Sequence, residues 1–122
     1  MSYAIGSGHL MFAFSQEKNV QELFSVNTDM SAMIAFEKAL TIALSRYDLI
    51  PSKNAQQIMD VLDKFVPDMD NIQNEFKRDG VAPPALVHQI RNQLNDESKT
   101  SFHYGATSQD LIDTSVMMRM RD

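Results

Sequence analysis

The chain has 122 residues, a formal net charge of −5 and no cysteine. This length fits one domain, in which folding removes about two-thirds of the unfolded surface from water. The acidic balance argues against nucleic acid and anionic membranes as partners, so we expect a small molecule or a protein instead. Without cysteine there is no disulfide or thiolate metal site, and His9, His88 and His103 lack zinc-site spacing. We therefore expect neither a metal nor a cofactor.

The N-terminal residues show no export signal, and no later stretch approaches membrane-spanning length. The start of the chain lacks a basic segment, and the apolar run at 10–14 is too short for export. We therefore expect a cytoplasmic protein. Residues 1–14 also contain Gly6 and Gly8 and lack a helical period, which predicts a loose segment unless its aromatic side chains dock on the body.

Hydrophobic spacing predicts two helices in the first part of the chain. Ser15 can cap a short helix that reaches about Phe24. After a break, Asn27 or Thr28 can cap a long helix that ends near Tyr47. The core stripe expected on the long helix consists of Met30, Met33, Phe36, Leu40, Ala43, Leu44 and Tyr47.

Glu37 lies within that apolar stripe, one turn from Met33 and Leu40. A buried carboxylate is costly unless it is paired, so we expect a partner for it. One interpretation is a catalytic base. The interpretation we favour is a structural bridge to an arginine or to backbone N–H groups.

Three further helices are predicted in the middle of the chain, separated by proline and glycine signals. The first begins at Ser52 and stops before Pro67. The second runs from an Asp68 cap to Gly80, and the third opens at Pro83. Their expected inward positions are Ile58, Leu62, Phe65, Met69, Ile72, Phe76, Leu86, Val87, Ile90 and Leu94.

A stretch of small and hydroxyl residues then has the features of a binding site. Gly105 and Ala106 carry almost no side chain, so a ligand could come close to the backbone there. Thr107 or Ser108 can cap a helix whose first N–H groups lack intrahelical partners. With the two hydroxyls and His103, these N–H groups would form a pocket for a carboxylate. The alternative is a plain helix cap beside a structural, hydrogen-bonded histidine.

The last segment, 108–122, is predicted to be a helix that needs neighbours on several sides, because its apolar residues cover more than half of its circumference. Asp110 and Asp113 suit the positive end of the helix dipole, but they would repel an anion unless their side chains turn away. The apolar pattern ends without a stop signal, which predicts a truncated helix whose partners lie downstream. Its exposed face at 111–120 should drive self-association or fraying of the helix.

Residues 103–110 read HYGATSQD and are followed by Asp113 and Thr114. This pattern closely resembles the first substrate-binding stretch of the fumarase and aspartase superfamily. Its GATSQD form is most similar to the 3-carboxy-cis,cis-muconate cycloisomerases, with the adenylosuccinate lyases next. Ser115 stands where the family usually has alanine. The segment FEKAL at 36–40 likewise resembles the superfamily's first long helix, where the glutamate is part of the scaffold.

The run VAPPALV at 81–87 bears on the branch of the superfamily. In the corresponding segment the adenylosuccinate lyases carry a histidine, a few residues before the position of His88, whereas the cycloisomerases have an apolar, proline-bearing run. The run therefore favours a cycloisomerase, although Pro83 and Pro84 depart from the usual cycloisomerase pattern. His88 itself lies off the buried side of its helix, so we expect it in solvent.

The resemblance implies an all-α fragment of a longer enzyme. Residues 1–106 would form a small N-terminal helical domain, and 107–122 the first turns of a central helical bundle. The family assembles as a homotetramer in which each active site draws on three subunits. The implied reaction closes 3-carboxy-cis,cis-muconate to a lactone, in aromatic degradation through the β-ketoadipate pathway.

The resemblance also implies roles for single residues. The substrate-binding residues would be His103, Thr107, Ser108 and Gln109, and the structural residues Glu37 and Gly105. Thr107 and Ser108 would bind a carboxylate of a di- or tricarboxylate substrate. The middle histidine stretch and the loop with the family's catalytic serine are absent from the sequence, so no catalytic residue is assigned. We expect the isolated chain to be inactive.

Two other functions are open. A C–N lyase similar to adenylosuccinate lyase would use the same carboxylate site, and turnover of each substrate separates the two enzymes. A non-catalytic helical module would instead bind a partner helix through the apolar face at 111–120.

Overall fold

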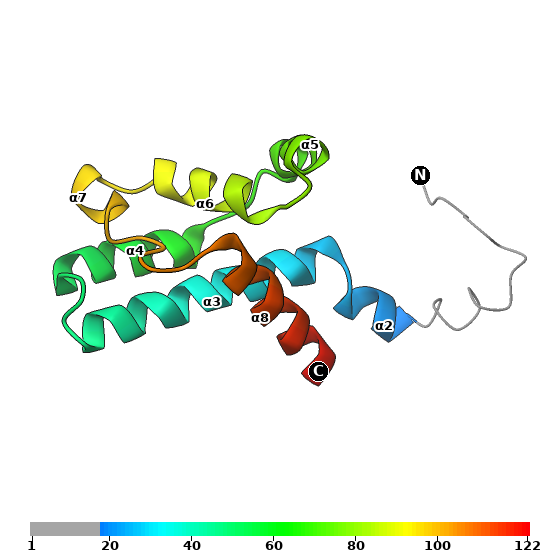
Figure 1. Ribbon diagram of the computed structural model, residues 1–122, viewed down its shortest axis with the longest axis horizontal. Helices are drawn as coiled ribbons and strands as arrows, with labels where there is room; N and C mark the ends of the chain where they lie inside the picture. Colours follow the sequence, from blue (N-terminus) through cyan, green and yellow to red (C-terminus); the bar gives the residue numbers. More distant parts are fainter. Residues whose placement is uncertain (1–17) are drawn as a thin grey trace, which may run out of the picture.

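The computed structural model describes residues 18–122, and within them the fold is all-α, which confirms the predicted fold class (Figure 1). The helices are α2 (Lys18–Leu23), α3 (Val26–Arg46), α4 (Ser52–Lys64), α5 (Met69–Asp79), α6 (Pro83–Asn92), α7 (Asp96–Lys99) and α8 (Ser108–Arg121). No helix in this part of the chain is long and apolar enough to span a membrane. The loose segment expected at 1–14 and the Ser15 cap lie outside the described residues.

Helix α3 starts earlier than predicted, because Ser25 is its N-cap rather than Asn27 or Thr28. The Ser25 hydroxyl accepts a hydrogen bond from the backbone N–H of Thr28 at 3.2 Å, which satisfies one of the first unpaired donors of the helix. The Thr28 hydroxyl instead donates to the carbonyl of Glu22 at 2.8 Å. This bond ties α2 to the start of α3.

The buried face of α3 is narrower and more polar than the predicted stripe. Its buried residues are Met30, Ala32, Met33, Glu37, Thr41 and Leu44. Ala43 is exposed and Tyr47 is 76% exposed, so the prediction that they lie in the core was wrong. Tyr47 occupies the C-cap, where the chain turns away toward α4. The helix packs through a seam of positions three and four apart, typical of two packed helices.

A single hydrophobic cluster joins α3 to α4, α5, α6 and α8. Ile58, Leu86, Ile90 and Leu111 have no exposed surface. Burial of such a side chain contributes about 1.5–3 kcal/mol relative to leaving it in water. The predicted inward positions of the middle helices are confirmed for most residues, but Phe76 of α5 is half-exposed and was wrongly expected in the core.

The predicted boundaries of the middle helices are confirmed. The Asp68 carboxylate caps α5 by accepting from the Asn71 backbone N–H at 3.1 Å. Gly80 ends α5 in the left-handed region with a φ of +75°, which glycine adopts without a side-chain penalty. Pro83 opens α6 at its first turn, and His88 on the same helix is exposed, as predicted.

Helix α8 packs beside α3, and in Figure 1 its C-terminal end extends past α3, away from α5, α6 and α7. Leu111 and Ser115 are its buried residues. Met117 and Met120 are 64% and 66% exposed. The described residues therefore cover only one side of α8.

Candidate functional site

The segment before α8 is held in place by buried polar contacts with α4. The side-chain amide of Asn54 donates to the Ser101 hydroxyl oxygen at 3.0 Å and to the Glu97 carbonyl at 3.2 Å. Asn54 and Ser101 are both buried, so the bond between them pairs polar groups that are largely removed from solvent. The contacts fix the start of the segment that carries the predicted site.

Phe102 anchors the same segment in the hydrophobic core, where it is almost fully buried. Its carbonyl accepts a hydrogen bond from the Arg91 guanidinium of α6 at 3.3 Å. The guanidinium carbon of Arg91 also lies 5.8 Å from the centre of the Phe102 ring, within cation–π range. These contacts therefore fix the backbone at the residue that precedes His103.

His103 and Gly105 both have left-handed backbone conformations, with φ values of +58° and +75°. The Ala106 N–H donates to the His103 carbonyl at 3.4 Å, which closes a tight turn with glycine at its third position. A Cβ atom on Gly105 would meet no other atom within 4 Å. Gly105 is therefore suited to its backbone conformation, and no neighbouring group within the described residues requires its small size.

The structure brings Glu37 and His103 together although 66 residues separate them. Oε1 of Glu37 is hydrogen-bonded to Nδ1 of His103. The Glu37 side chain is 0% exposed and that of His103 is 13% exposed. The predicted burial of Glu37 is confirmed, but its partner is a histidine rather than an arginine or the backbone. Oε2 of Glu37 is buried and has no hydrogen-bond partner among the described residues.

Helix α8 begins at Ser108, as predicted, and Thr107 is its N-cap. The Asp110 side chain folds back over this helix end, where its Oδ2 accepts from the Thr107 N–H at 2.7 Å and from the Thr107 hydroxyl at 3.1 Å. The carboxylate therefore does not turn away from the helix N-terminus. It takes the position that an anionic ligand would need in order to use Thr107.

The remaining donors of the helix end belong to Ser108 and Gln109. The Asp110 N–H donates to the Thr107 carbonyl at 3.1 Å, whereas no described residue accepts from the N–H groups of Ser108 and Gln109. The Gln109 side chain donates to Asp113 Oδ1 at 2.6 Å. Thr107 and Gln109 are exposed and Ser108 is half-buried, so this helix end lies at an open surface of the described residues.

A second polar group joins α3 and α8, and no sequence pattern predicted it. The Ser115 hydroxyl donates to Asp29 Oδ1 at 2.5 Å, and the Arg119 guanidinium pairs with the same oxygen at 3.2 Å. Ser115 is fully buried. The only sequence signal was that Ser115 replaces the alanine usual in the family it resembles, which makes a new polar partner necessary.

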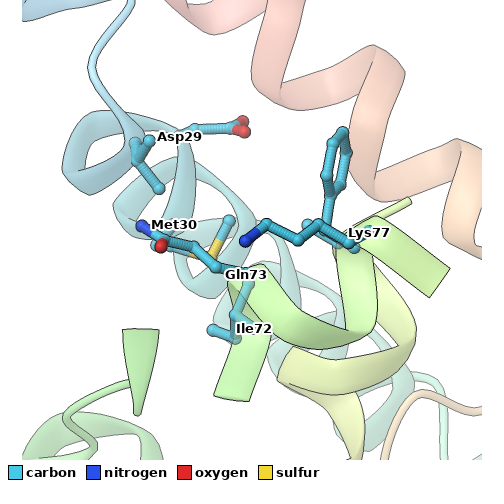
Figure 2. Close-up of a pocket in the computed structure, with 8 residues that line it drawn as sticks. Asp29, Met30, Ile72, Gln73 and Lys77 are labelled. Carbon is cyan, nitrogen blue, oxygen red and sulfur yellow. The ribbon is translucent and has the colours of Figure 1, made fainter. Parts of the chain in front are cut away.

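A cavity of about 440 Å³ lies between α3 and α5, apart from the predicted site residues. Figure 2 shows residues of α3 facing residues of α5 across it, with Asp29, Met30, Ile72, Gln73 and Lys77 labelled. Its lining is mainly apolar. None of His103, Thr107, Ser108 and Gln109 belongs to it, so the sequence motif and this cavity are separate features. No group of three or more acidic or histidine side chains in residues 18–122 could hold a metal ion.

Similarity searches connect this arrangement with one class of protein. No protein-family model matches the chain. The fold aligns with the crystal structure of a fumarate lyase from Mesorhizobium sp. BNC1, with a TM-score of 0.81 and 30% sequence identity, over 86% of this chain and 25% of that one. The chain is thus a partial, low-identity relative of the fumarase and aspartase superfamily, as its HYGATSQD stretch predicted.

The particular relatives come from two branches of the superfamily. The 3-carboxy-cis,cis-muconate cycloisomerase of Acinetobacter baylyi is 29% identical over 113 residues, which cover 87% of this chain and 25% of the relative. The adenylosuccinate lyase of Methanothermobacter thermautotrophicus is 28% identical over 101 residues, which cover 82% of this chain and 22% of the relative. The chain therefore spans about a quarter of the length of the curated relatives it matches.

Proposed function

We propose that the chain supplies part of the substrate site of a superfamily lyase or cycloisomerase, by binding a substrate carboxylate at the N-terminus of α8 beside His103. The observation that carries the proposal is that His103, whose ring is held by a buried carboxylate, lies in the turn that leads to a helix end where the Ser108 and Gln109 N–H groups have no acceptor among the described residues. Helix N-termini favour anions through these donors and the helix dipole. The similarity to lyases and a cycloisomerase supports a carboxylate as the anion.

Within this proposal, the backbone N–H groups of Ser108 and Gln109 bind the carboxylate and the Ser108 hydroxyl adds a third donor. The Thr107 hydroxyl becomes available only if the Asp110 carboxylate swings away from the helix end. Removal of a proton from the carbon next to a substrate carboxylate generates an enolate-like dianion. Donors arranged in advance stabilise this charge because they need no reorganisation during the reaction.

The finer proposal is a cycloisomerase that closes 3-carboxy-cis,cis-muconate to a lactone. Its support is the GATSQD form at 105–110, the apolar run at 81–87 and the Acinetobacter baylyi relative. The second candidate is a C–N lyase, supported by the adenylosuccinate lyase relative of nearly equal identity. Both enzymes would place a carboxylate of a di- or tricarboxylate substrate on the same helix end.

The same proposal divides the chain and gives it partners. Residues 1–106 would be the N-terminal helical domain and 107–122 the first turns of a bundle that a homotetramer completes. The exposed Met117 and Met120 support a helix face that awaits neighbours. A non-catalytic module that binds a partner helix through 111–120 would use the same face.

Carboxylate binding can be tested on this chain by NMR titration with fumarate. We expect concentration-dependent shifts of the Ser108 and Gln109 amides and of the His103 ring, with little change at exposed His88. Ser108→Ala should weaken binding several-fold. Ser52→Ala is the matched control, since Ser52 is likewise the first residue of a helix, α4, and should leave binding unchanged. Equal binding by the two variants would contradict the role of Ser108.

Catalysis is tested separately from binding. We propose that the acid–base residues are supplied from outside this chain, so the purified chain should convert neither 3-carboxy-cis,cis-muconate nor adenylosuccinate. Turnover of either substrate by the chain alone would contradict this division of roles. In the complete enzyme, the substrate that is converted identifies the branch.

A further inference from the structure

Among residues 18–122, the fully buried carboxylate of Glu37 has one polar contact, which is His103. A carboxylate that only braces a fold is usually bonded through both oxygens, because each unpaired lone pair in the interior is unfavourable. Here Oε2 has no partner among the described residues, and Oε1 contacts Nδ1 of the imidazole. Among the described residues, the Glu37 carboxylate therefore interacts with Nδ1 of His103 alone.

His103 is held in a conformation that a non-glycine residue rarely adopts. Its φ of +58° places it in the left-handed region, at an energy of about 1–3 kcal/mol above an ordinary conformation. The anchored Phe102 before it and the tight turn after it keep the backbone there. The Glu37 contact then fixes the orientation of the imidazole ring.

We propose that Glu37 is a positioning residue that keeps the proton of neutral His103 on Nδ1 and presents Nε2 to the carboxylate site at α8. An ionised carboxylate can only accept, so the ring nitrogen that it contacts must carry the proton. Nδ1 and Nε2 lie on opposite sides of the imidazole, and no described residue forms a hydrogen bond with Nε2. Nε2 is thus the atom left for a ligand.

The consequence for binding rests on the proposed function. With Nδ1 held by Glu37, Nε2 accepts a hydrogen bond from a protonated ligand group. Alternatively, Nε2 takes up one proton from solvent, keeps it and donates a hydrogen bond to a ligand carboxylate, which gives an imidazolium between two carboxylates. The other charged side chains that approach this segment are Arg91 of α6, on the Phe102 carbonyl, and Asp110 at the start of α8. In both states Nδ1 stays with Glu37.

The tautomer can be measured by NMR of the chain with nitrogen-15 in its histidine rings, under conditions where the rings are neutral. We expect His103 to show the form protonated on Nδ1, whereas solvent-exposed His88 shows the mixture of a free imidazole. Signals are assigned with His88→Gln and His103→Gln. If His103 of the unaltered chain is protonated on Nε2 instead, the proposal is overturned without any Glu37 variant.

Two Glu37 variants separate positioning from bracing. Glu37→Gln keeps the shape and an acceptor oxygen, so His103 should keep its proton on Nδ1. Glu37→Ala removes the acceptor, and the His103 signals should move to the mixture seen for His88. A purely structural Glu37 would lower the melting temperature in Glu37→Ala and leave the tautomer unchanged, and that result overturns the proposal.

Fumarate then distinguishes this proposal from the proposed function. A shift of Nε2, with Nδ1 unchanged, supports both. If the tautomer follows Glu37 as expected but fumarate moves neither Nε2 nor the Ser108 amide, the carboxylate site is wrong and the positioning role stands. If fumarate binds equally well to the unaltered chain and to a folded Glu37→Ala, the positioning role is wrong.

Discussion

Two sets of charged contacts in this small protein differ in burial and in the distance that they bridge along the chain. On α5, Arg78 and Asp79 are adjacent in sequence, and their side chains pair in solvent at 2.9 Å. On α3, Glu37 pairs with His103 and Asp29 pairs with Arg119, across the interior of the fold. The first set shapes the surface locally, and the second joins elements that are far apart in sequence.

The difference shows which contacts position the residues of the candidate site. Exposed ion pairs contribute little because water screens them. A buried pair excludes other arrangements, because separating it leaves an uncompensated charge in the interior. The buried Glu37–His103 pair and the partly buried group of Asp29, Ser115 and Arg119 connect α3 with the segment 103–119, so the turn before α8 is positioned by α3 rather than by its own sequence.

The largest effect is expected from breaking the buried pair at α3. Glu37→Ala removes a buried hydrogen bond to a charged acceptor, which contributes about 1.5–3 kcal/mol, so the melting temperature should fall by about 6 °C or more. Glu37→Gln should lose much less, because the amide oxygen can still accept from Nδ1. Thermal unfolding followed by circular dichroism measures both. Equal melting temperatures for Glu37→Ala and the unaltered chain would show that this pair, like the surface contacts, contributes little to stability.

A smaller effect is expected at the second buried group. Ser115→Ala removes the hydroxyl that donates to Asp29, while Arg119 still pairs with the carboxylate. The loss should be about 1.5 kcal/mol, the lower end for hydrogen bonds to charged groups. Ser31→Ala is the matched control, since Ser31 is an exposed serine within α3. If both variants are equally stable, the Ser115 bond adds nothing to the packing of α8.

Backbone strain offers a third test that separates stability from the site. Gly80 and Gly105 share a φ of +75°, and a Cβ atom at either position would meet no atom within 4 Å. Alanine at each should therefore cost about 1–2 kcal/mol, from the left-handed conformation alone. Only Gly105→Ala should shift the NMR signals of His103 and Ser108, because Gly80 ends α5. Similar shifts from both variants would show that these NMR signals respond to the stability of the whole fold.

Local signals were enough to predict much of the fold from the sequence. Asp68, Gly80 and Pro83 mark helix ends through contacts within a few residues, so these boundaries are confirmed. Likewise, the start of α8 follows from the hydroxyl residues before it. Ser25 was missed because positions 25–28 hold three residues able to cap, and only the path of α2 decides between them.

Tertiary pairing could not be predicted in the same way. The position of Glu37 in an apolar stripe showed that it needed a partner, but the partner is 66 residues away and depends on how α8 crosses α3. The Ser115 bond to Asp29 spans 86 residues and had no pattern of its own. From the sequence, Asp110 could either cap the helix or repel a bound anion. Only the structure shows that it caps the helix.

The smallest effect is expected at the exposed pair on α5. The Arg78 guanidinium donates to Asp79 and so holds the pKa of that carboxyl below its ordinary value. A lowered pKa in the folded state adds stability above the unfolded pKa, and this is lost as pH falls through the folded value. The two residues are adjacent and lie at the surface, so the same contact also forms in the unfolded chain and cancels. Asp79→Asn should therefore leave the melting temperature unchanged at pH 7 and at about pH 3. A pH-dependent loss of stability in this variant, as large as that of Ser115→Ala, would remove the distinction between surface and buried contacts.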